Sequence, residues 1–162
     1  MDIQFVGLPT EQVLATKASG QDAYQLPIER HRAEDSGHPC RHCLNETPVG
    51  DDYLVLAWKP FSGTNPYTET GPIFLCAENC QGAMPSQSLP TILQSPQYLV
   101  RGYSSDERIV YGTGNVVPTP EIPDYASQLL SNPNIAFVDV RSAANNCFQC
   151  RVQRASDADH AA

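Results

Sequence analysis

The sequence predicts an α+β protein: a single compact domain of mostly antiparallel sheet, with hairpins and two or three short helices. Among 162 residues, 14 prolines and 10 glycines indicate many turns between short elements. Hydrophobic residues make up 41% and charged residues 17%, which is typical of a globular chain. We expect one domain over residues 1–155 and a disordered C-terminal tail over 156–162, where the residues are small and polar.

The N-terminal part is predicted to contain a strand, a short helix and a long loop. Residues 2–6 are mainly apolar and suit a strand, and residues 11–18 suit a short helix. Gly20 follows that helix and can adopt the left-handed conformation that ends one. Residues 21–39 hold many charged and few apolar side chains, so we expect a surface loop there.

The middle of the chain is predicted to form strands separated by turns. Residues 53–58 are apolar enough for a buried strand, which Pro60 would stop. A segment rich in Gly and Pro then leads into a short strand over residues 73–76. Residues 98–103 and 108–113 flank a polar turn and predict a β-hairpin.

The clearest helix lies near residue 122, where apolar side chains recur on one helical face. These side chains are Ile122, Tyr125, Ala126, Leu129 and Leu130. Thr119 is placed to cap the helix, and Pro120 suits its first position. Residues 135–141 then predict a central apolar strand, and residues 147–154 are expected to return antiparallel to it.

Charge and hydropathy argue against several kinds of partner. The net charge is −8, from ten Lys and Arg against eighteen Asp and Glu. We therefore expect no binding to nucleic acid phosphates and none to an anionic membrane surface. The apolar runs are too short to span a bilayer, and the first residues lack the pattern of a signal peptide. A cytoplasmic location follows as the expectation.

Six cysteines in three close pairs are the strongest chemical signal in the chain. The pairs are Cys40 with Cys43, Cys76 with Cys80, and Cys147 with Cys150. In a reducing compartment, clustered thiols indicate a metal site or redox chemistry more than a disulfide framework. Buried thiols that only pack as small hydrophobic groups are the plainest alternative.

Zinc is the cofactor that this pattern favours. Two Cys-x-x-Cys turns can supply the four sulfurs of a tetrahedral structural site. The first and third pairs have that spacing, although they lie far apart in the chain, and the second pair could replace either of them. All six cysteines are thus candidate ligands: Cys40, Cys43, Cys76, Cys80, Cys147 and Cys150.

A thiol-based redox sensor or oxidoreductase is the first alternative. It would use Cys40 and Cys43, with His42 between them stabilising a thiolate. Against it, the residues that follow are broken by Pro48, and no helix can place its N-terminus at Cys40. Whether the chain is an enzyme stays open.

A small-molecule or partner-binding module is the second alternative. Its pocket is expected near residues 69–74 and 141–146. Three arginines that border predicted strands, Arg101, Arg108 and Arg141, could hold an anionic ligand there.

Five stretches of the chain resemble a bacterial family of unknown function, DUF1203. They are PCRHCL at 39–44, YTETGPIF at 67–74, YLVRGY at 98–103, RIVYGT at 108–113 and NNCFQCRV at 145–152. They occur in order and cover most of the chain. The resemblance implies a compact α+β domain from a bacterium and implies no particular activity.

Overall fold

Two antiparallel sheets make up the fold, and a computed structural model describes them over residues 1–155. The larger sheet has the order β1 (Ile3–Val6), β8 (Phe148–Arg154), β7 (Phe137–Ser142), β5 (Gln97–Tyr103) and β6 (Asn115–Pro118). The smaller sheet has the order β2 (Glu29–Arg32), β3 (Asp52–Trp58) and β4 (Gly71–Cys76). Every pair of neighbouring strands is antiparallel, which confirms the predicted kind of sheet.

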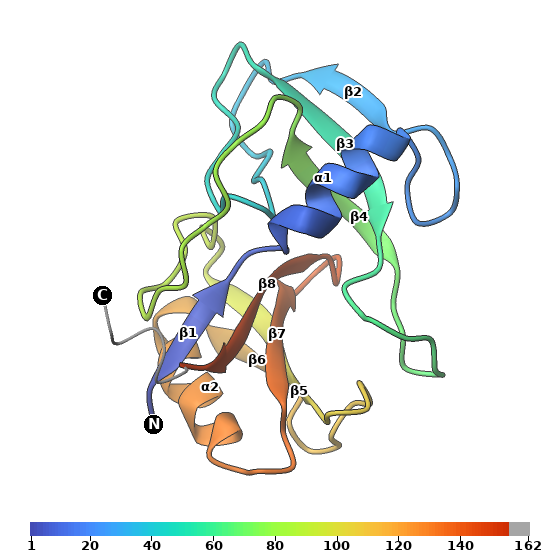
Figure 1. The fold of residues 1–162 in the computed structure, drawn as a ribbon. Coiled ribbons are helices and arrows are strands. Elements are labelled where there is room, and N and C mark those ends of the chain that lie inside the picture. The colour runs from blue at the N-terminus through green and yellow to red at the C-terminus, as the bar shows by residue number, and fades with distance from the viewer. Residues whose placement is uncertain (156–162) are drawn as a thin grey trace.

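Two α-helices and one 3₁₀ turn accompany the sheets. Figure 1 shows α1 (Thr10–Ser19) beside the smaller sheet and α2 (Ile122–Leu130) against the larger one, preceded by the 3₁₀ turn η1 (Thr119–Glu121). The predicted number of short helices is therefore confirmed, and α1 ends at Gly20, whose φ is 67°. Over the described residues, neither α-helix has the length and apolar character needed to cross a membrane. The tail predicted over 156–162 lies outside the described residues.

The main core lies between the larger sheet and α2. Alternate residues of the strands point to one face, so β5, β7 and β8 present a set of small apolar side chains to the helix. The fully buried members are Val100, Val138, Val140, Cys150 and Val152 from the strands, and Ile122, Ala126 and Leu130 from α2. The predicted apolar face of the helix is the one that packs.

A second core lies between the smaller sheet and α1. It contains Val13 from the helix, alternate residues of β3 and β4, and Phe148 from the larger sheet. Phe148 is the first residue of β8, so its ring joins the second core to one end of the larger sheet. The two sheets therefore meet near the start of β8.

The predicted hairpin over 98–113 is wrong in its second strand. The turn exists, since the Ser104 N–H donates to the Arg108 carbonyl at 2.9 Å, but only one isolated bridge follows it. The strand that pairs with β5 begins at Asn115. Thr113 explains the difference, because its hydroxyl accepts from the Gly102 N–H at 3.0 Å and replaces a backbone partner.

Two smaller predictions also differ from the structure. The loop expected over 21–39 contains strand β2, whose side chains are polar and exposed on the sheet edge. Nothing in its polar sequence alternates, so no strand pattern was visible there. Thr119 does not cap α2, because it opens the 3₁₀ turn and its hydroxyl donates to the Ser95 carbonyl.

Candidate functional site

Four of the six cysteines come together in one cluster. The sulfurs of Cys40, Cys43, Cys76 and Cys80 all lie within 4.8 Å of one another. The Cys40 and Cys80 sulfurs are 3.8 Å apart, and those of Cys43 and Cys76 are 4.0 Å apart. Sulfurs on one tetrahedral zinc ion lie about 3.8 Å apart, given bonds of about 2.3 Å. The four thiols thus fit a metal ion, and they form no disulfide.

The Cys40–Cys43 turn is fixed by its own backbone and by β4. The Leu44 N–H donates to the Cys40 carbonyl at 2.9 Å, with Leu44 in the left-handed region at φ 56°. The Arg41 N–H donates to the Phe74 carbonyl at 3.0 Å, and Cys40 bridges Phe74 in parallel. Since Cys76 ends the same strand two residues later, this contact brings the second thiol pair to the first.

Two glycines allow other segments to close over this turn. A Cβ atom at Gly7 would lie 2.4 Å from the His42 carbonyl oxygen, which is too close for any side chain. A Cβ atom at Gly82 would lie 2.7 Å from Thr10 Oγ1 and 2.8 Å from His42 Nε2. The neighbouring Leu8 and Ala83 N–H groups donate to the Arg41 and His42 carbonyls. The turn is therefore enclosed from two sides.

His42 lies beside the cluster and not in it. Its ring is almost fully buried, with Nδ1 3.2 Å from the Cys80 sulfur and Nε2 2.8 Å from Thr10 Oγ1. Burial lowers the pKa of His42, which favours the neutral ring. A proton on Nδ1 then donates to the Cys80 sulfur, while Nε2 accepts from the Thr10 hydroxyl. His38 stacks on the Tyr53 ring, with the ring centroids 4.0 Å apart.

The cluster favours ionisation of Cys40 over that of Cys76 and Cys80. Hydrogen bonds from the Cys43 and Cys76 thiols lower the pKa of Cys40. The hydrogen bond with Cys40 raises the pKa of Cys76, and burial raises that of Cys80 to about 12. Four thiols this close cannot all ionise, because their negative charges would repel one another. Four thiolates therefore require a positive ion among them.

The third cysteine pair lies elsewhere. Cys150 is fully buried in the core under α2, and burial raises its pKa, so this thiol packs as a neutral group. The Cys147 sulfur is 3.8 Å from the Asn145 carbonyl oxygen in the turn before β8. The expected site shared by Cys40, Cys43 and this pair is not formed, because the strand turns Cys150 into the core.

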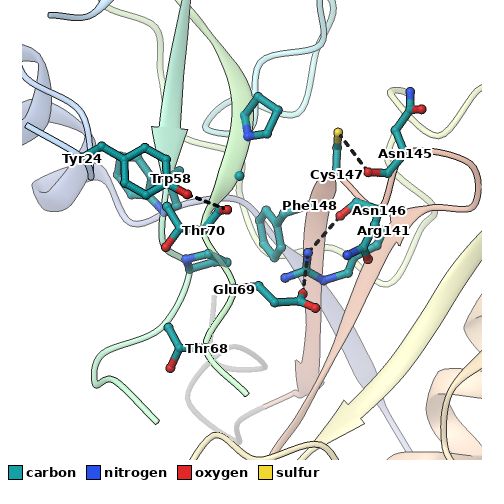
Figure 2. Close-up of a pocket in the computed structure, with 13 residues that line it drawn as sticks. Tyr24, Trp58, Thr68, Glu69, Thr70, Arg141, Asn145, Asn146, Cys147 and Phe148 are labelled. Carbon is teal, nitrogen blue, oxygen red and sulfur yellow. Dashed lines mark hydrogen bonds and ion pairs between the residues drawn. The ribbon is translucent and has the colours of Figure 1, made fainter. Parts of the chain in front are cut away.

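A separate pocket of about 540 Å³ lies between the segment that leads into β4 and the turn from β7 to β8. Figure 2 shows Trp58 beside Tyr24 on one side of it and Phe148 next to Glu69 and Arg141 on the other. A pocket was predicted from the sequence near residues 69–74 and 141–146, and residues of both segments line this one.

Arg141 is the notable group in the pocket. Its side chain is 4% exposed, and Nη1 contacts Glu69 Oε2 at 2.9 Å and the Asn146 carbonyl at 3.0 Å. Arg101 Nη2 reaches the same Glu69 oxygen at 2.8 Å, so two guanidinium groups share one carboxylate. The third arginine, Arg108, is half exposed beside Asp106 and does not line the pocket.

Comparison with known protein families gives a match. The model of a protein family of unknown function, DUF1203, matches residues 37–154. The chain belongs to the DUF1203 family. The match covers all four clustered cysteines, Glu69 and the two arginines bonded to it, whereas Thr10 and Gly7 precede it. No curated protein and no solved structure matches the chain.

The sequence did not indicate which four of the six cysteines come together. The pairs were visible, but the choice among them depends on the parallel contact between Cys40 and Phe74, which no local pattern encodes. The role of Thr10 was missed as well. A hydroxyl in the first turn of α1 carries no signal of a partner thirty-two residues away.

Proposed function

We propose that this DUF1203 protein binds one zinc ion through Cys40, Cys43, Cys76 and Cys80, and that the ion has a structural role. The observation that carries the proposal is the approach of four thiol sulfurs to within 4.8 Å. Four sulfurs complete a tetrahedral coordination shell and leave no position for a substrate. When bound, zinc would supply the positive charge that lets the four thiolates coexist.

The location of the cluster supports a structural role. Its cysteines come from the 40–43 turn, the end of β4 and the segment after it, so one ion would join three segments. Arg41, inside the turn, is buried and donates from Nε to the Phe148 carbonyl at 2.7 Å. The 40–43 turn is therefore hydrogen-bonded to both sheets, at the junction where their cores meet.

Metal analysis of untagged protein tests the proposal. We expect about one zinc per chain, and we expect a strong chelator to lower the melting temperature. Cys76→Ser should lose the zinc, while the matched variant Cys147→Ser should keep it. Protein without any bound metal and with six freely titrating thiols would overturn the proposal, as would equal zinc loss in both variants.

The thiol redox hypothesis makes opposite predictions. A redox Cys40 would be exposed and would react quickly with alkylating agents near neutral pH. The Cys40 side chain is fully buried, which disfavours that chemistry. Fast, selective alkylation of Cys40 in metal-free protein would favour the redox role over the structural one.

A further inference from the structure

One edge of the Arg141 guanidinium has no hydrogen-bond partner. Nε and Nη2 are buried and unpaired among the described residues, while Nη1 makes both of the bonds that the side chain forms. Nε and Nη2 point their N–H bonds in the same direction, so they form the fork that binds planar anions. A buried charged donor without an acceptor is costly, so an acceptor belongs at this edge.

Arg151, in the same sheet, shows which kind of group such a fork binds. Its Nε donates to Asp139 Oδ1 at 2.7 Å, and its Nη2 donates to Asp139 Oδ2 at 3.1 Å. Both carboxylate oxygens are used, in the paired geometry that a guanidinium and a carboxylate favour. The corresponding edge of Arg141 lacks such a carboxylate from the described chain.

Ion pairs extend from Arg141 in the pocket wall to the neighbouring arginines. Arg101, Arg141 and Arg151 face two carboxylates, Glu69 and Asp139. Glu69 Oε2 is shared between two arginines, and Asp139 is engaged by the third. Arg141 therefore has a carboxylate on Nη1, and among the described residues it has none on its Nε and Nη2 edge.

We propose that the pocket binds a small organic carboxylate, with its two oxygens on the Nε and Nη2 edge of Arg141. Trp58 and Phe148 give the pocket an apolar lining, so the carboxylate would be attached to an aromatic or aliphatic body. Nε and Nη2 are covered by the chain, so the ligand would enter by displacing Glu69, which is one-third exposed and holds Nη1 of the same guanidinium.

Titration of the zinc-loaded protein with benzoate tests this proposal. Benzamide has the same shape without the charge, and inorganic phosphate has charge without the apolar body. We expect benzoate to bind at least about tenfold more tightly than either. Equal affinity for benzoate and benzamide, no benzoate binding, or tighter binding of phosphate would each overturn the assignment.

Two variants assign the binding to Arg141. Arg141→Lys keeps the charge and loses the fork, so benzoate affinity should fall about tenfold. Glu69→Gln removes the competing negative charge and should strengthen benzoate binding. Arg108→Lys, outside the pocket, should change nothing. Unchanged benzoate affinity in a folded Arg141→Lys protein would overturn the proposal, and if that variant does not fold, unchanged affinity in Glu69→Gln would do so.

Discussion

His42 links the cysteine cluster to α1 through one ring. Its Nδ1 faces the Cys80 sulfur and its Nε2 faces the Thr10 hydroxyl, and the ring is buried. A hydrogen bond to a ligand sulfur orients that ligand and tunes its charge. The chemistry of this residue is therefore that of a supporting group, even though its place between two cysteines resembles that of a ligand.

Replacing His42 should weaken metal binding without abolishing it. We expect His42→Ala to lower zinc affinity by about ten- to hundredfold, because Cys80 loses its donor. Competition with a chelator of known affinity measures the change. His31→Ala is the control, since that side chain is half exposed on β2. Equal zinc affinity in the two variants would show that the contact with Cys80 has no effect.

Gly82 is expected to be intolerant of any side chain. A Cβ atom there would lie within 2.8 Å of both Thr10 Oγ1 and His42 Nε2. We expect Gly82→Ala to cost about 1–3 kcal/mol of unfolding free energy, because two hydrogen-bonded groups must shift. Gly63→Ala is the matched control, since its nearest neighbour would lie at an ordinary 3.8 Å. Denaturant unfolding compares the two, and similar stabilities would contradict the expected clash.

At the scale of elements, Asp22 ties the segment after α1 to β3. Its carboxylate accepts from the Tyr24, Leu26 and Ala57 N–H groups. Burial opposes ionisation, but these backbone donors outweigh it and lower the pKa of Asp22 below 3.8. A lowered folded-state pKa adds stability above the unfolded pKa, and that stability is lost as the pH falls through the folded value.

Asp22→Asn should therefore destabilise the protein in a pH-dependent way. We expect a lower melting temperature than the parent at pH 7, and a difference that shrinks as the pH falls from 3.8 through the lower folded-state pKa of Asp22. Asp35→Asn, on a side chain 83% exposed, is the control. Comparing variants at each pH cancels any effect of metal release. A difference from the parent that does not change with pH would contradict the role of the Asp22 charge.

Elements with an apolar pattern could be predicted from the sequence, and elements without one could not. β3 is a run of apolar residues, and α2 repeats them with helical spacing, so both were found close to their observed bounds. β2 pairs through its backbone while its four side chains are polar and exposed. The strand after the 104–108 turn was misplaced because one threonine hydroxyl replaces a backbone partner.

The candidate sites follow the same rule. The cysteine pairs and the pocket segments near Glu69 and Arg141 could be identified from residue type and spacing. The grouping of Cys40 with Cys76 could not, because it depends on how β4 meets a distant turn. The unpaired edge of Arg141 is likewise a property of side-chain packing, and a sequence carries no record of it.

For the whole molecule, the cysteine cluster lies where the two sheets are joined. We expect chelation to loosen this junction first and to leave the core under α2 protected. Hydrogen exchange should rise in residues 40–43, in residues 76–80 and in the link from β1 to α1. Strands β5 and β7 serve as the internal control. A uniform increase across the chain, or none in the 40–43 turn, would contradict this order.

The pairing of β1 with β8 has a mechanical consequence. Ile3 lies opposite Arg154, and the Ala155 N–H donates to the Asp2 carbonyl, so the two ends of the described chain leave the sheet side by side. A force applied between them would open β1 like a zipper, one hydrogen bond at a time. After β1 in the chain, the next hydrogen bond to carry load joins the Leu8 N–H to the Arg41 carbonyl in the 40–43 turn. Tension on the N-terminus would thus be delivered to the cysteine cluster.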